Sequence, residues 1–299
     1  MMRFDAFQPC EIVATVDGLE GVYLGDTAEC RAVCLIVAGS GPTDANGNNP
    51  RTPRSDNLLK LAHSLAEAGI ASLRFDKRGV ARSAAGAPAE EEMTLQTAAA
   101  DVVMWVQWLR TRSPAGKLFL CGHSEGALLS LMAAQSCQVD GLISLCGPGR
   151  RLDYILAQQL ESAPMPFALR IRARAIMAAL VAGRRVGEVE PALAALFRPS
   201  VQPFMISLLA RNPMQDMAAC TAPVLVVGGG RDFQVTREDF DALFRARPEV
   251  AWLWLPAMNH ALKDEPATDD GLLAIDSEKD RPLAKGLVEG ISTFILAHT

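Results

Sequence analysis

Short apolar runs that suit β-strands alternate with helical patterns along the first half of this chain, and this alternation restricts the possible folds most strongly. The pattern predicts strands at 11–16, 21–25, 32–37, 70–75, 117–121 and 141–146, and helices at 56–68, 94–112 and 125–136. Strands that alternate with helices favour a mostly parallel sheet that is covered by helices on both faces.

The alternation stops at Arg150, and residues 150–219 show only helix-like stretches that are interrupted by prolines. It resumes with a strand at 222–230, a helix near 236–246, a strand at 250–255 and a final helix near 282–297. A chain of 299 residues that is 49% hydrophobic can bury one large core. We therefore expect an α/β core formed by residues 1–149 and 220–299, with a helical insertion at 150–219.

Composition and charge exclude several classes of protein. A net charge of −5 gives no reason to expect a nucleic acid partner. The first 18 residues lack the apolar run of a secretory signal, and no later run reaches the ~18 apolar residues of a membrane span. The seven cysteines are odd in number and lack C-x-x-C spacing, which favours reduced thiols over disulfides or zinc ligands. These features predict a cytoplasmic protein without a membrane span.

The insertion at 150–219 is rich in arginine. It holds nine arginines and no lysine against five acidic residues, so its formal charge is +4. One interpretation is a solvated helix face, and the other is a cap that attracts anionic substrates.

The segment 117–135 contains the G-x-S-x-G pattern, with Gly122, Ser124 and Gly126 at its fixed positions. The five-residue pattern alone is also compatible with an ordinary glycine turn. Here it lies between a buried strand and a helix, which is the sharp turn that a nucleophilic serine of this kind occupies. We therefore expect Ser124 to be a nucleophile, with a helix dipole pointing its positive end at the reacting centre.

A serine hydroxyl becomes an effective nucleophile only when a neighbouring base takes its proton. The chain has four histidines, and elimination leaves one candidate for that base. His123 is held in the turn beside the serine, His63 falls within a predicted helix, and His298 lies one residue from the carboxyl end. His260 remains, directly after the last predicted strand.

The base needs an acid that fixes its tautomer and stabilises the imidazolium. Asp232 follows the strand at 222–230 and lies 28 residues before His260. Asp264 and Glu265 are rivals, but they are too close to His260 in sequence to approach its far nitrogen easily. The order Ser124, Asp232, His260 matches the order found in α/β-hydrolases.

The loop at 35–51 packs glycines, asparagines and a proline behind an apolar run. It is not a P-loop, because no lysine follows Gly41 before Lys60. A dinucleotide fingerprint is excluded because Asp44 replaces its third glycine. Residues 44–48 offer alternating oxygen ligands, but the glycine has the wrong position for an EF-hand. We expect the loop to present backbone N–H groups, and we expect neither a metal ion nor a cofactor.

The chain resembles the α/β-hydrolase superfamily over nearly its whole length, and in particular bacterial carboxylesterases with a helical cap inserted after the sixth core strand. The resemblance is carried by AGSGPTD (38–44), RFDKRGVARS (74–83), GHSEG (122–126), GGRDFQV (229–235) and MNHALK (258–263). Two residues depart from the family pattern. Ala38 replaces a common histidine of the oxyanion loop, and Ala81 replaces a common glycine. We assign no catalytic role to Asp76 or Arg78.

The resemblance also implies the position of the oxyanion hole. Its donors would be the backbone N–H groups of Ser40 and Glu125, while Gly39 and Gly41 let the chain approach the substrate closely. The side chain of Glu125 must then point away from the oxyanion.

These features predict a carboxylic-ester hydrolase that acts on short to medium acyl chains of a small-molecule substrate through an acyl-enzyme. The alternatives are a thioesterase or a serine aminopeptidase that uses the same triad. An inactive hydrolase scaffold that serves as a binding module is a further alternative, although such relatives usually lose a triad residue and all three are present here. An aminopeptidase requires an acidic cluster for the substrate amine, and the five acids of the insertion show no obvious clustering.

Overall fold

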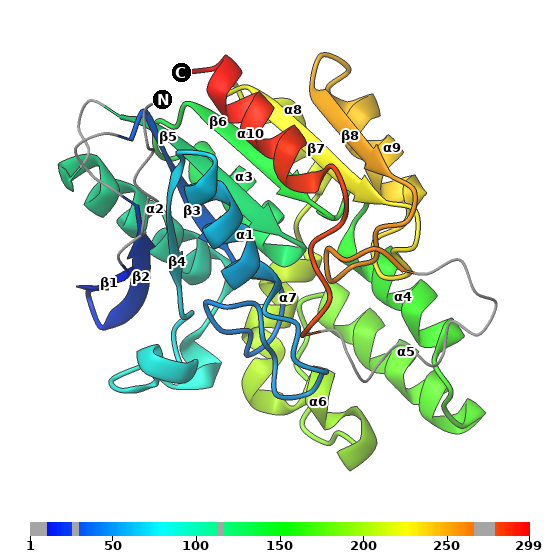
Figure 1. Ribbon diagram of the computed structural model, residues 1–299. Helices are drawn as coiled ribbons and strands as arrows, with labels where there is room; N and C mark the ends of the chain where they lie inside the picture. Colours follow the sequence, from blue (N-terminus) through cyan, green and yellow to red (C-terminus); the bar gives the residue numbers. More distant parts are fainter. Residues whose placement is uncertain (1–10, 26–29, 113–115, 266–278) are drawn as a thin grey trace, which may run out of the picture.

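An eight-stranded sheet forms the centre of the protein in a computed structural model that describes residues 11–25, 30–112, 116–265 and 279–299 (Figure 1). The strands are β1 Glu11–Val16, β2 Leu19–Leu24, β3 Ala32–Val37, β4 Ala71–Phe75, β5 Lys117–His123, β6 Gly141–Leu145, β7 Val224–Gly229 and β8 Ala251–Leu255. Their order in the sheet is β1-β2-β4-β3-β5-β6-β7-β8. β2 runs antiparallel to β1 and β4, and all pairs from β4 to β8 are parallel. The prediction of a mostly parallel sheet is therefore confirmed.

The first hairpin begins its second strand earlier than the sequence pattern suggested. β2 starts at Leu19, whereas the prediction placed this strand at 21–25. Asp17 and Gly18 both have positive φ, 46° and 76°, so they form a two-residue turn that pairs β1 with β2 at once. The Asp-Gly dipeptide was the signal for this turn.

Helices cover both faces of the sheet, as predicted. The face that packs on Ile36, Phe119 and Ile143 carries α1 Asn57–Glu67 and α10 Leu287–Ala297. The opposite face carries α2 Leu95–Arg112, α3 Glu125–Ala134 and α9 Arg237–Ala246. Two short 3₁₀ turns, η1 Ala81–Ala84 and η2 Glu90–Glu92, precede α2.

Two backbone positions explain local differences from the expected pattern. The last helix begins at Leu287 instead of 282, because Gly286 at its N-cap has a φ of 85° and starts the helix there. Ala81, which departs from the glycine that the family resemblance suggested, has a φ of 44°. This conformation suits glycine better than alanine, so the chain tolerates a strained residue at this turn.

Residues between β6 and β7 form helices only. They are α4 Leu152–Ser162, α5 Phe167–Val181, η3 Pro191–Leu193, α6 Ala194–Phe197, η4 Pro199–Val201, α7 Gln202–Leu209 and α8 Pro213–Ala219. Figure 1 shows α4 to α7 beyond the carboxyl ends of the parallel strands, whereas α8 contacts α3 and α9. The division into a core of 1–149 and 220–299 and a cap of 150–219 stays a prediction.

One segment of the described residues, Pro191–Leu209, is long and apolar enough by composition to cross a membrane. A third of it is buried inside the protein. The segment is divided into η3, α6, η4 and α7, and new turns begin at Pro191 and Pro199. Its Arg198 forms an ion pair with Glu90. In this structure the segment is therefore a series of 3₁₀ turns and short helices, of which α7 packs against α2 and α5.

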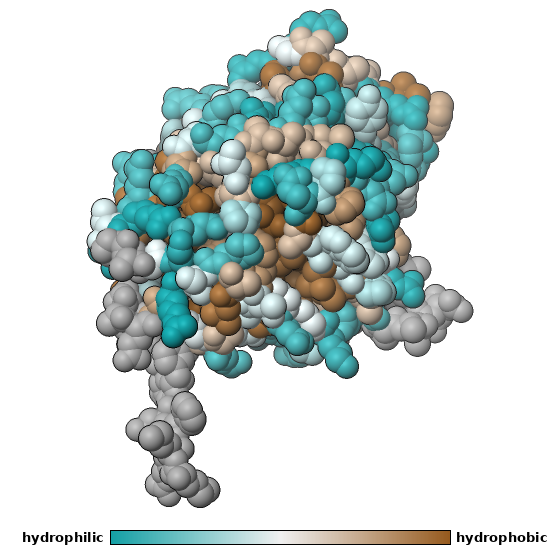
Figure 2. All heavy atoms as spheres, turned by 90° about the horizontal axis from the view of Figure 1, so that it is seen from above, coloured by the Kyte–Doolittle hydropathy of each residue, from teal (hydrophilic) through white to brown (hydrophobic). Residues whose placement is uncertain are grey.

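On the face seen from above in Figure 1, hydrophobic residues are interspersed with hydrophilic ones (Figure 2). Inside the protein, Phe119 of β5 is fully buried, and its ring meets Phe294 of α10 edge-on at 6.3 Å between centroids. This contact joins the central strand to the helix layer that covers it.

We expect Phe119→Ala to lower the free energy of unfolding by about 3–5 kcal/mol, because the substitution leaves a cavity between the sheet and α10. The same substitution at Phe167, whose side chain is 73% exposed, should change it by less than about 0.5 kcal/mol. Urea unfolding followed by circular dichroism measures both. Equal effects at the two positions would contradict this description of the core.

Candidate active site

Ser124 lies on a sharp turn between β5 and α3. Its φ of 54° and ψ of −122° fall in a region that residues other than glycine rarely adopt. The turn is held by two hydrogen bonds, from the N–H of Ser124 to the carbonyl of Leu145 and from the N–H of Ala127 to the carbonyl of Ser124, both at 2.9 Å. The serine therefore stands at the N-terminus of α3, where the helix dipole favours negative charge.

Two glycines flank this turn because the backbone there is too crowded for a side chain. A Cβ on Gly122 would lie 2.2 Å from the carbonyl oxygen of Gly126. A Cβ on Gly126 would lie 2.2 Å from the carbonyl oxygen of Val37 at the end of β3. The turn thus packs backbone against backbone on β3, and this places Ser124 beside the loop that follows β3.

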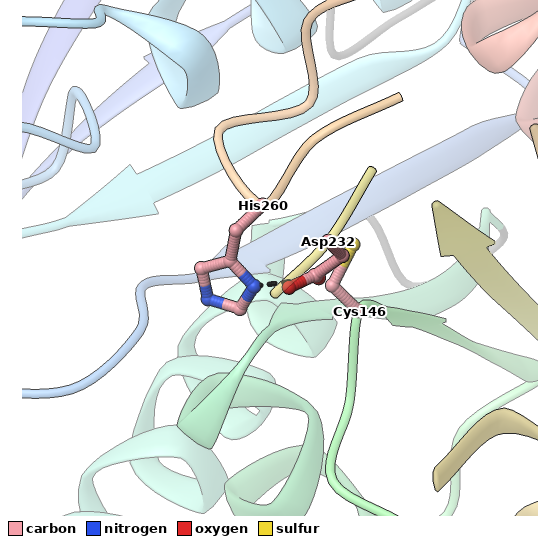
Figure 3. Close-up of side chains that lie close together, drawn as sticks. All are labelled: Cys146, Asp232 and His260. Atoms are coloured by element: carbon pink, nitrogen blue, oxygen red, sulfur yellow. Dashed lines mark hydrogen bonds and ion pairs between the residues drawn. The ribbon is translucent and has the colours of Figure 1, made fainter. Parts of the chain in front are cut away.

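His260 and Asp232 form a short hydrogen bond, with Nδ1 and Oδ2 2.7 Å apart (Figure 3). Asp232 follows β7, His260 follows β8, and these two strands are neighbours in the sheet. A carboxylate oxygen accepts the bond, so Nδ1 carries the proton and Nε2 is left as the basic nitrogen. The structure thus brings together the acid and the base that the sequence selected.

The environment of Asp232 keeps its carboxyl group ionised. Burial alone would raise its pKa, but the bond and charge of His260 and the N–H groups of Val235 and Gln234 lower it below the usual value. The Asp232 side chain is fully buried. A fixed buried carboxylate of this kind orients the imidazole and stabilises its protonated form.

The rival acids have other partners. The Oδ2 atom of Asp264 accepts the N–H of Lys285 at 3.0 Å. The Oε1 atom of Glu265 accepts a bond from the side-chain amide of Asn259 at 3.3 Å. The carboxylate that accepts the hydrogen bond from the His260 ring is that of Asp232.

His123 has a structural contact that the sequence did not reveal. Its Nε2 donates to the backbone carbonyl of His260 at 2.8 Å, and the two rings are 4.9 Å apart. Burial and the neighbouring His260 lower its pKa to about 3, so the ring stays neutral. The position of His123 next to Ser124 was the only sequence signal for this contact. Its partner could not be predicted from the sequence, because it depends on where the loop after β8 lies in the fold. The ring therefore supports the loop that carries His260.

The remaining histidines lie elsewhere. The Nε2 atom of His63 is 3.4 Å from a carboxylate oxygen of Glu11, and the Nδ1 atom of His298 contacts the carbonyl of Phe294 at 2.7 Å. The choice of His260 as the base stays a prediction.

His123 directly precedes Ser124 and donates to the backbone carbonyl of His260, so one hydrogen bond links the serine turn to the loop that carries His260. Within the described ranges, the Ser124 hydroxyl makes no hydrogen bond to the imidazole. Such bonds are often long in free enzymes and shorten when substrate binds. In the part of the chain that the structure describes, Nε2 of His260 has no hydrogen-bond partner, and its contact with Ser124 stays a prediction.

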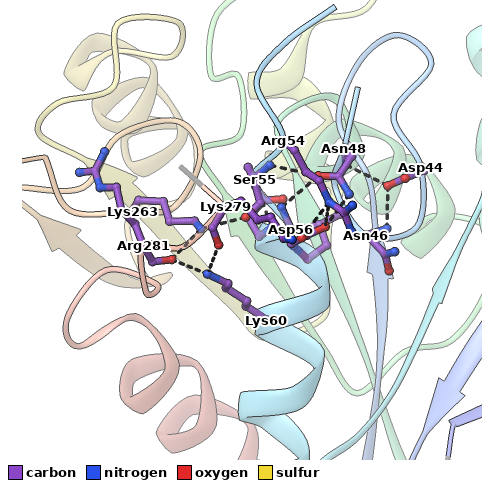
Figure 4. A network of polar contacts seen from close by, with 12 residues as sticks. Asp44, Asn46, Asn48, Arg54, Ser55, Asp56, Lys60, Lys263, Lys279 and Arg281 are labelled. Atoms are coloured by element: carbon purple, nitrogen blue, oxygen red, sulfur yellow. Dashed lines mark hydrogen bonds and ion pairs between the residues drawn. The ribbon is translucent and has the colours of Figure 1, made fainter. Parts of the chain in front are cut away.

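The loop after β3 has two parts with different structures. In its second part, Oδ1 of Asp44 accepts the N–H groups of Asn46 at 2.9 Å and Asn48 at 2.8 Å (Figure 4). The side chain of Asn48 in turn accepts the N–H groups of Ser55 and Asp56 at the start of α1. This part of the loop is therefore a turn held by side-chain hydrogen bonds, and backbone donors occupy the Oδ1 atom of Asp44.

A second buried contact fixes this turn from the side of His260. Lys263, three residues after His260, is fully buried and donates from Nζ to the carbonyls of Ser55 and Arg281 (Figure 4). The loop after β3 and the loop after β8 are therefore tied together beneath the site.

In its first part, the loop presents Gly39, Ser40 and Gly41 beside the serine turn. A Cβ on Gly39 would lie 3.2 Å from Cβ of Ser124, and Gly41 has a φ of 70°. In the part of the chain that the structure describes, the N–H groups of Ser40 and Glu125 donate no hydrogen bond to another residue. Both groups are thus available to a negatively charged oxygen, as an oxyanion hole requires.

A cavity of about 630 Å³ adjoins these residues. Ser124, Ser40 and Glu125 lie on its wall, and side chains from the helices after β6 form much of the rest. The apolar lining includes Leu128, Leu152, Ile155, Leu156, Phe204, Met205 and Leu208. A volume of this size suits a small organic ligand, and the lining suits an apolar group.

Each acidic side chain on the cavity wall already has a cationic partner. Glu90 pairs with Arg198, Asp101 with Arg78 at 2.8 Å, and Glu125 with Lys77 at 3.7 Å. The pKa of Glu90 is held below its usual value, mainly by its hydrogen bond to Arg198. Among the described residues that line the cavity, no carboxylate is left to bind a substrate amine.

The arginines of the 150–219 insertion are mostly neutralised. Six of the nine form ion pairs with acidic residues: Arg150, Arg151, Arg172, Arg174, Arg198 and Arg211. Of the nine, Arg198 alone lines the cavity, and it is bound to Glu90. These pairs favour the interpretation of a solvated surface over one of a cap that attracts anions.

Three potential metal ligands cluster behind His260. The ligand atoms of Cys146, Asp232 and His260 lie within 4.8 Å of one another (Figure 3). The Asp232 oxygen and His260 Nδ1 are bonded to each other, and burial and the Asp232 charge raise the pKa of the Cys146 thiol well above its usual value. A metal requires a thiolate and a free nitrogen here. The cluster fits a hydrogen-bonded acid better than a metal centre.

The fold and the arrangement of the site define an α/β-hydrolase. The chain belongs to the family described as serine aminopeptidase, S33, whose model matches residues 52–267. That span includes β4 to β8 and the residues Ser124, Asp232 and His260.

Three known proteins illustrate the similarity. Esterase EstD of Thermotoga maritima is 26% identical in an alignment of 263 residues that covers 83% of this chain and 59% of that protein, so the chain spans about three fifths of its relative. The structure of Est1E from Butyrivibrio proteoclasticus has a TM-score of 0.59 at 18% identity, covering 96% of this chain and 98% of that one. A proline iminopeptidase of Mycobacterium smegmatis gives 0.58 at 16% identity, covering 97% and 98%.

The neutral, buried His123 predicts a pH-dependent stability. Between pH ~6.5 and about 3, the unfolded chain binds a proton at this position that the folded chain does not bind. Stability should therefore fall on acidification, by up to about 1.4 kcal/mol per pH unit for this single group. We expect His123→Gln to have a shallower decline than the wild type.

Urea unfolding across this pH window measures the difference. Parallel curves for the wild type and His123→Gln would contradict the assignment of a neutral His123.

Proposed function

We propose that this chain is a serine hydrolase that cleaves carboxylic esters, with Ser124 as nucleophile, His260 as base and Asp232 as the orienting acid. The main support is the 2.7 Å hydrogen bond between Asp232 and His260. It lies at the carboxyl ends of the parallel strands, where the strained Ser124 turn also lies. The name of the esterase relative from Thermotoga maritima agrees with this activity.

The reaction begins when the Ser124 oxygen attacks the acyl carbon while Nε2 of His260 takes the hydroxyl proton. The carbonyl oxygen becomes an anion and accepts hydrogen bonds from the N–H groups of Ser40 and Glu125. The tetrahedral intermediate collapses, the bond to the alcohol oxygen breaks, and His260 returns its proton to that oxygen. The product of this half-reaction is an ester of Ser124 and a free alcohol.

Water then completes the cycle. His260 takes a proton from water, the water oxygen attacks the acyl carbon, and the same two N–H groups stabilise the second anion. Collapse breaks the bond to Ser124, which regains its proton from His260. Asp232 stays ionised throughout and stabilises the imidazolium.

The cavity supports an apolar substrate of modest size. Its volume of about 630 Å³ and its lining by leucine, isoleucine, phenylalanine and methionine suit short to medium acyl chains. Helices α4 to α7, within the predicted cap of residues 150–219, would then cover the site.

An aminopeptidase is the second candidate, because the family description names that activity. Such an enzyme binds the substrate's α-ammonium group with a free carboxylate. The three carboxylates on the described cavity wall are bound to Arg198, Arg78 and Lys77, which favours a neutral substrate over an amine. A thioesterase would use the same triad, and the presence of all three triad residues argues against an inactive scaffold.

We expect Ser124→Ala and His260→Ala each to lower kcat for a nitrophenyl ester by roughly 10⁴–10⁶ without loss of the fold. A fluorophosphonate should label the wild type stoichiometrically and should not label Ser124→Ala. Steady-state kinetics, circular dichroism and mass spectrometry measure these effects. Ordinary turnover by Ser124→Ala would refute the proposal.

A substrate panel separates the activities that share this triad. The proposal predicts that kcat/KM for nitrophenyl esters of short and medium acids exceeds that for aminoacyl nitroanilides by at least about 10²-fold, since the amine finds no free carboxylate. Acyl-CoA thioesters complete the panel. Preference for an aminoacyl amide or a thioester would replace the ester assignment.

A further inference from the structure

Three neighbouring strands place one residue each at a common point. β4, β3 and β5 are adjacent and parallel, and Lys77, Gly39 and Glu125 each lie two residues beyond the end of their strand. Nζ of Lys77 donates a hydrogen bond to the carbonyl of Gly39 and is 3.7 Å from Oε1 of Glu125. Lys77 after β4 and Glu125 after β5 thus meet at the carboxyl end of β3, which lies between these two strands.

The contact on Gly39 controls the direction of a neighbouring donor. The carbonyl of Gly39 and the N–H of Ser40 belong to one peptide unit, which is planar and trans, so the two groups point in opposite directions. When Lys77 holds the carbonyl, the N–H of Ser40 must face the other way. That direction is otherwise free to change, because Gly39 has no side chain to restrict it.

The ion pair is largely shielded from water. The Lys77 side chain is 15% exposed and that of Glu125 only 6%, so water screens them poorly. Burial lowers the pKa of Lys77, and the Glu125 carboxylate partly opposes that effect. The two proposed oxyanion donors are the backbone N–H groups of Ser40 and Glu125. Lys77 connects them, because it contacts both the Gly39 carbonyl next to Ser40 and the Glu125 side chain.

We propose that Lys77 and the side chain of Glu125 are positioning residues that hold the Gly39–Ser40 peptide in the orientation needed to stabilise the oxyanion. The proposal rests on the ester hydrolase function given above. Neither side chain transfers a proton or contacts the reacting atoms. Their effect passes through the backbone N–H of Ser40, which stabilises the transition state more than the bound substrate. Loss of either side chain should therefore lower kcat and leave KM nearly unchanged.

The test compares Lys77→Met with the wild type on a nitrophenyl ester and on its thiono analogue, in which sulfur replaces the carbonyl oxygen. Sulfur is larger and a weaker acceptor, so it gains little from donors set for oxygen. We expect Lys77→Met to lower kcat for the oxygen ester about 10- to 100-fold. KM and the rate on the thiono ester should each change by less than about threefold.

Three further variants make the test specific. Lys77→Arg should restore much of the lost kcat, because its guanidinium also donates to a carbonyl and pairs with Glu125. Glu125→Gln keeps the backbone N–H and should lower kcat in the same selective way. The double variant Lys77→Met/Glu125→Gln should be no slower than Lys77→Met alone, because both changes break one contact.

Lys117→Met is the matched control. It removes a lysine that pairs with Asp140 at 3.1 Å at the opposite end of β5, and it should leave both esters unaffected. Melting temperatures of all variants show whether the fold is retained.

The proposal is overturned if Lys77→Met and Glu125→Gln slow both esters equally, if they change KM alone, or if they leave kcat at the wild-type value. A change in KM alone would identify Lys77 as a direct substrate contact. Failure of the ester hydrolase proposal would look different, because Ser124→Ala would then hydrolyse the oxygen ester at the wild-type rate.

Discussion

The close backbone contact between the serine turn and the end of β3 is the constraint on which the site depends. Gly122 packs against Gly126, and Gly126 against the carbonyl of Val37, with no room for a Cβ at either glycine. This contact fixes the strained Ser124 at the start of α3 and sets it beside the loop after β3. Because interiors are close-packed, a larger residue would separate these parts instead of being absorbed.

The strands that carry the site run parallel, so the loops after their carboxyl ends meet at the same end of the sheet. The loops after β3, β5, β7 and β8 carry Ser40, Ser124, Asp232 and His260, which are far apart in the sequence. Buried polar contacts connect these loops, including the bond from His123 to the His260 backbone. Buried contacts of this kind are rigid, and rigid donors and bases need little rearrangement when charge develops during reaction.

The sequence predicted the features that depend on local pattern. It located Ser124 from a strand, a turn and a helix, and it located Asp232 and His260 from their places after strands. The partners of His123 and Lys77 were missed, because they depend on which strands are neighbours. β3 lies between β4 and β5, and this order cannot be read from the chain itself. The early start of β2 depends on the two-residue turn at Asp17 and Gly18, whose positive φ values pair the strands at once.

The central claim is that the Ser124 hydroxyl reacts where two backbone N–H groups receive the resulting negative charge. A crystal structure of the protein treated with an alkyl phosphonate tests it most directly. The account predicts a covalent bond from phosphorus to Ser124, with the phosphoryl oxygen about 2.7–3.1 Å from the backbone nitrogens of Ser40 and Glu125. A phosphoryl oxygen that faces away from both nitrogens, or an adduct on another residue, would contradict it.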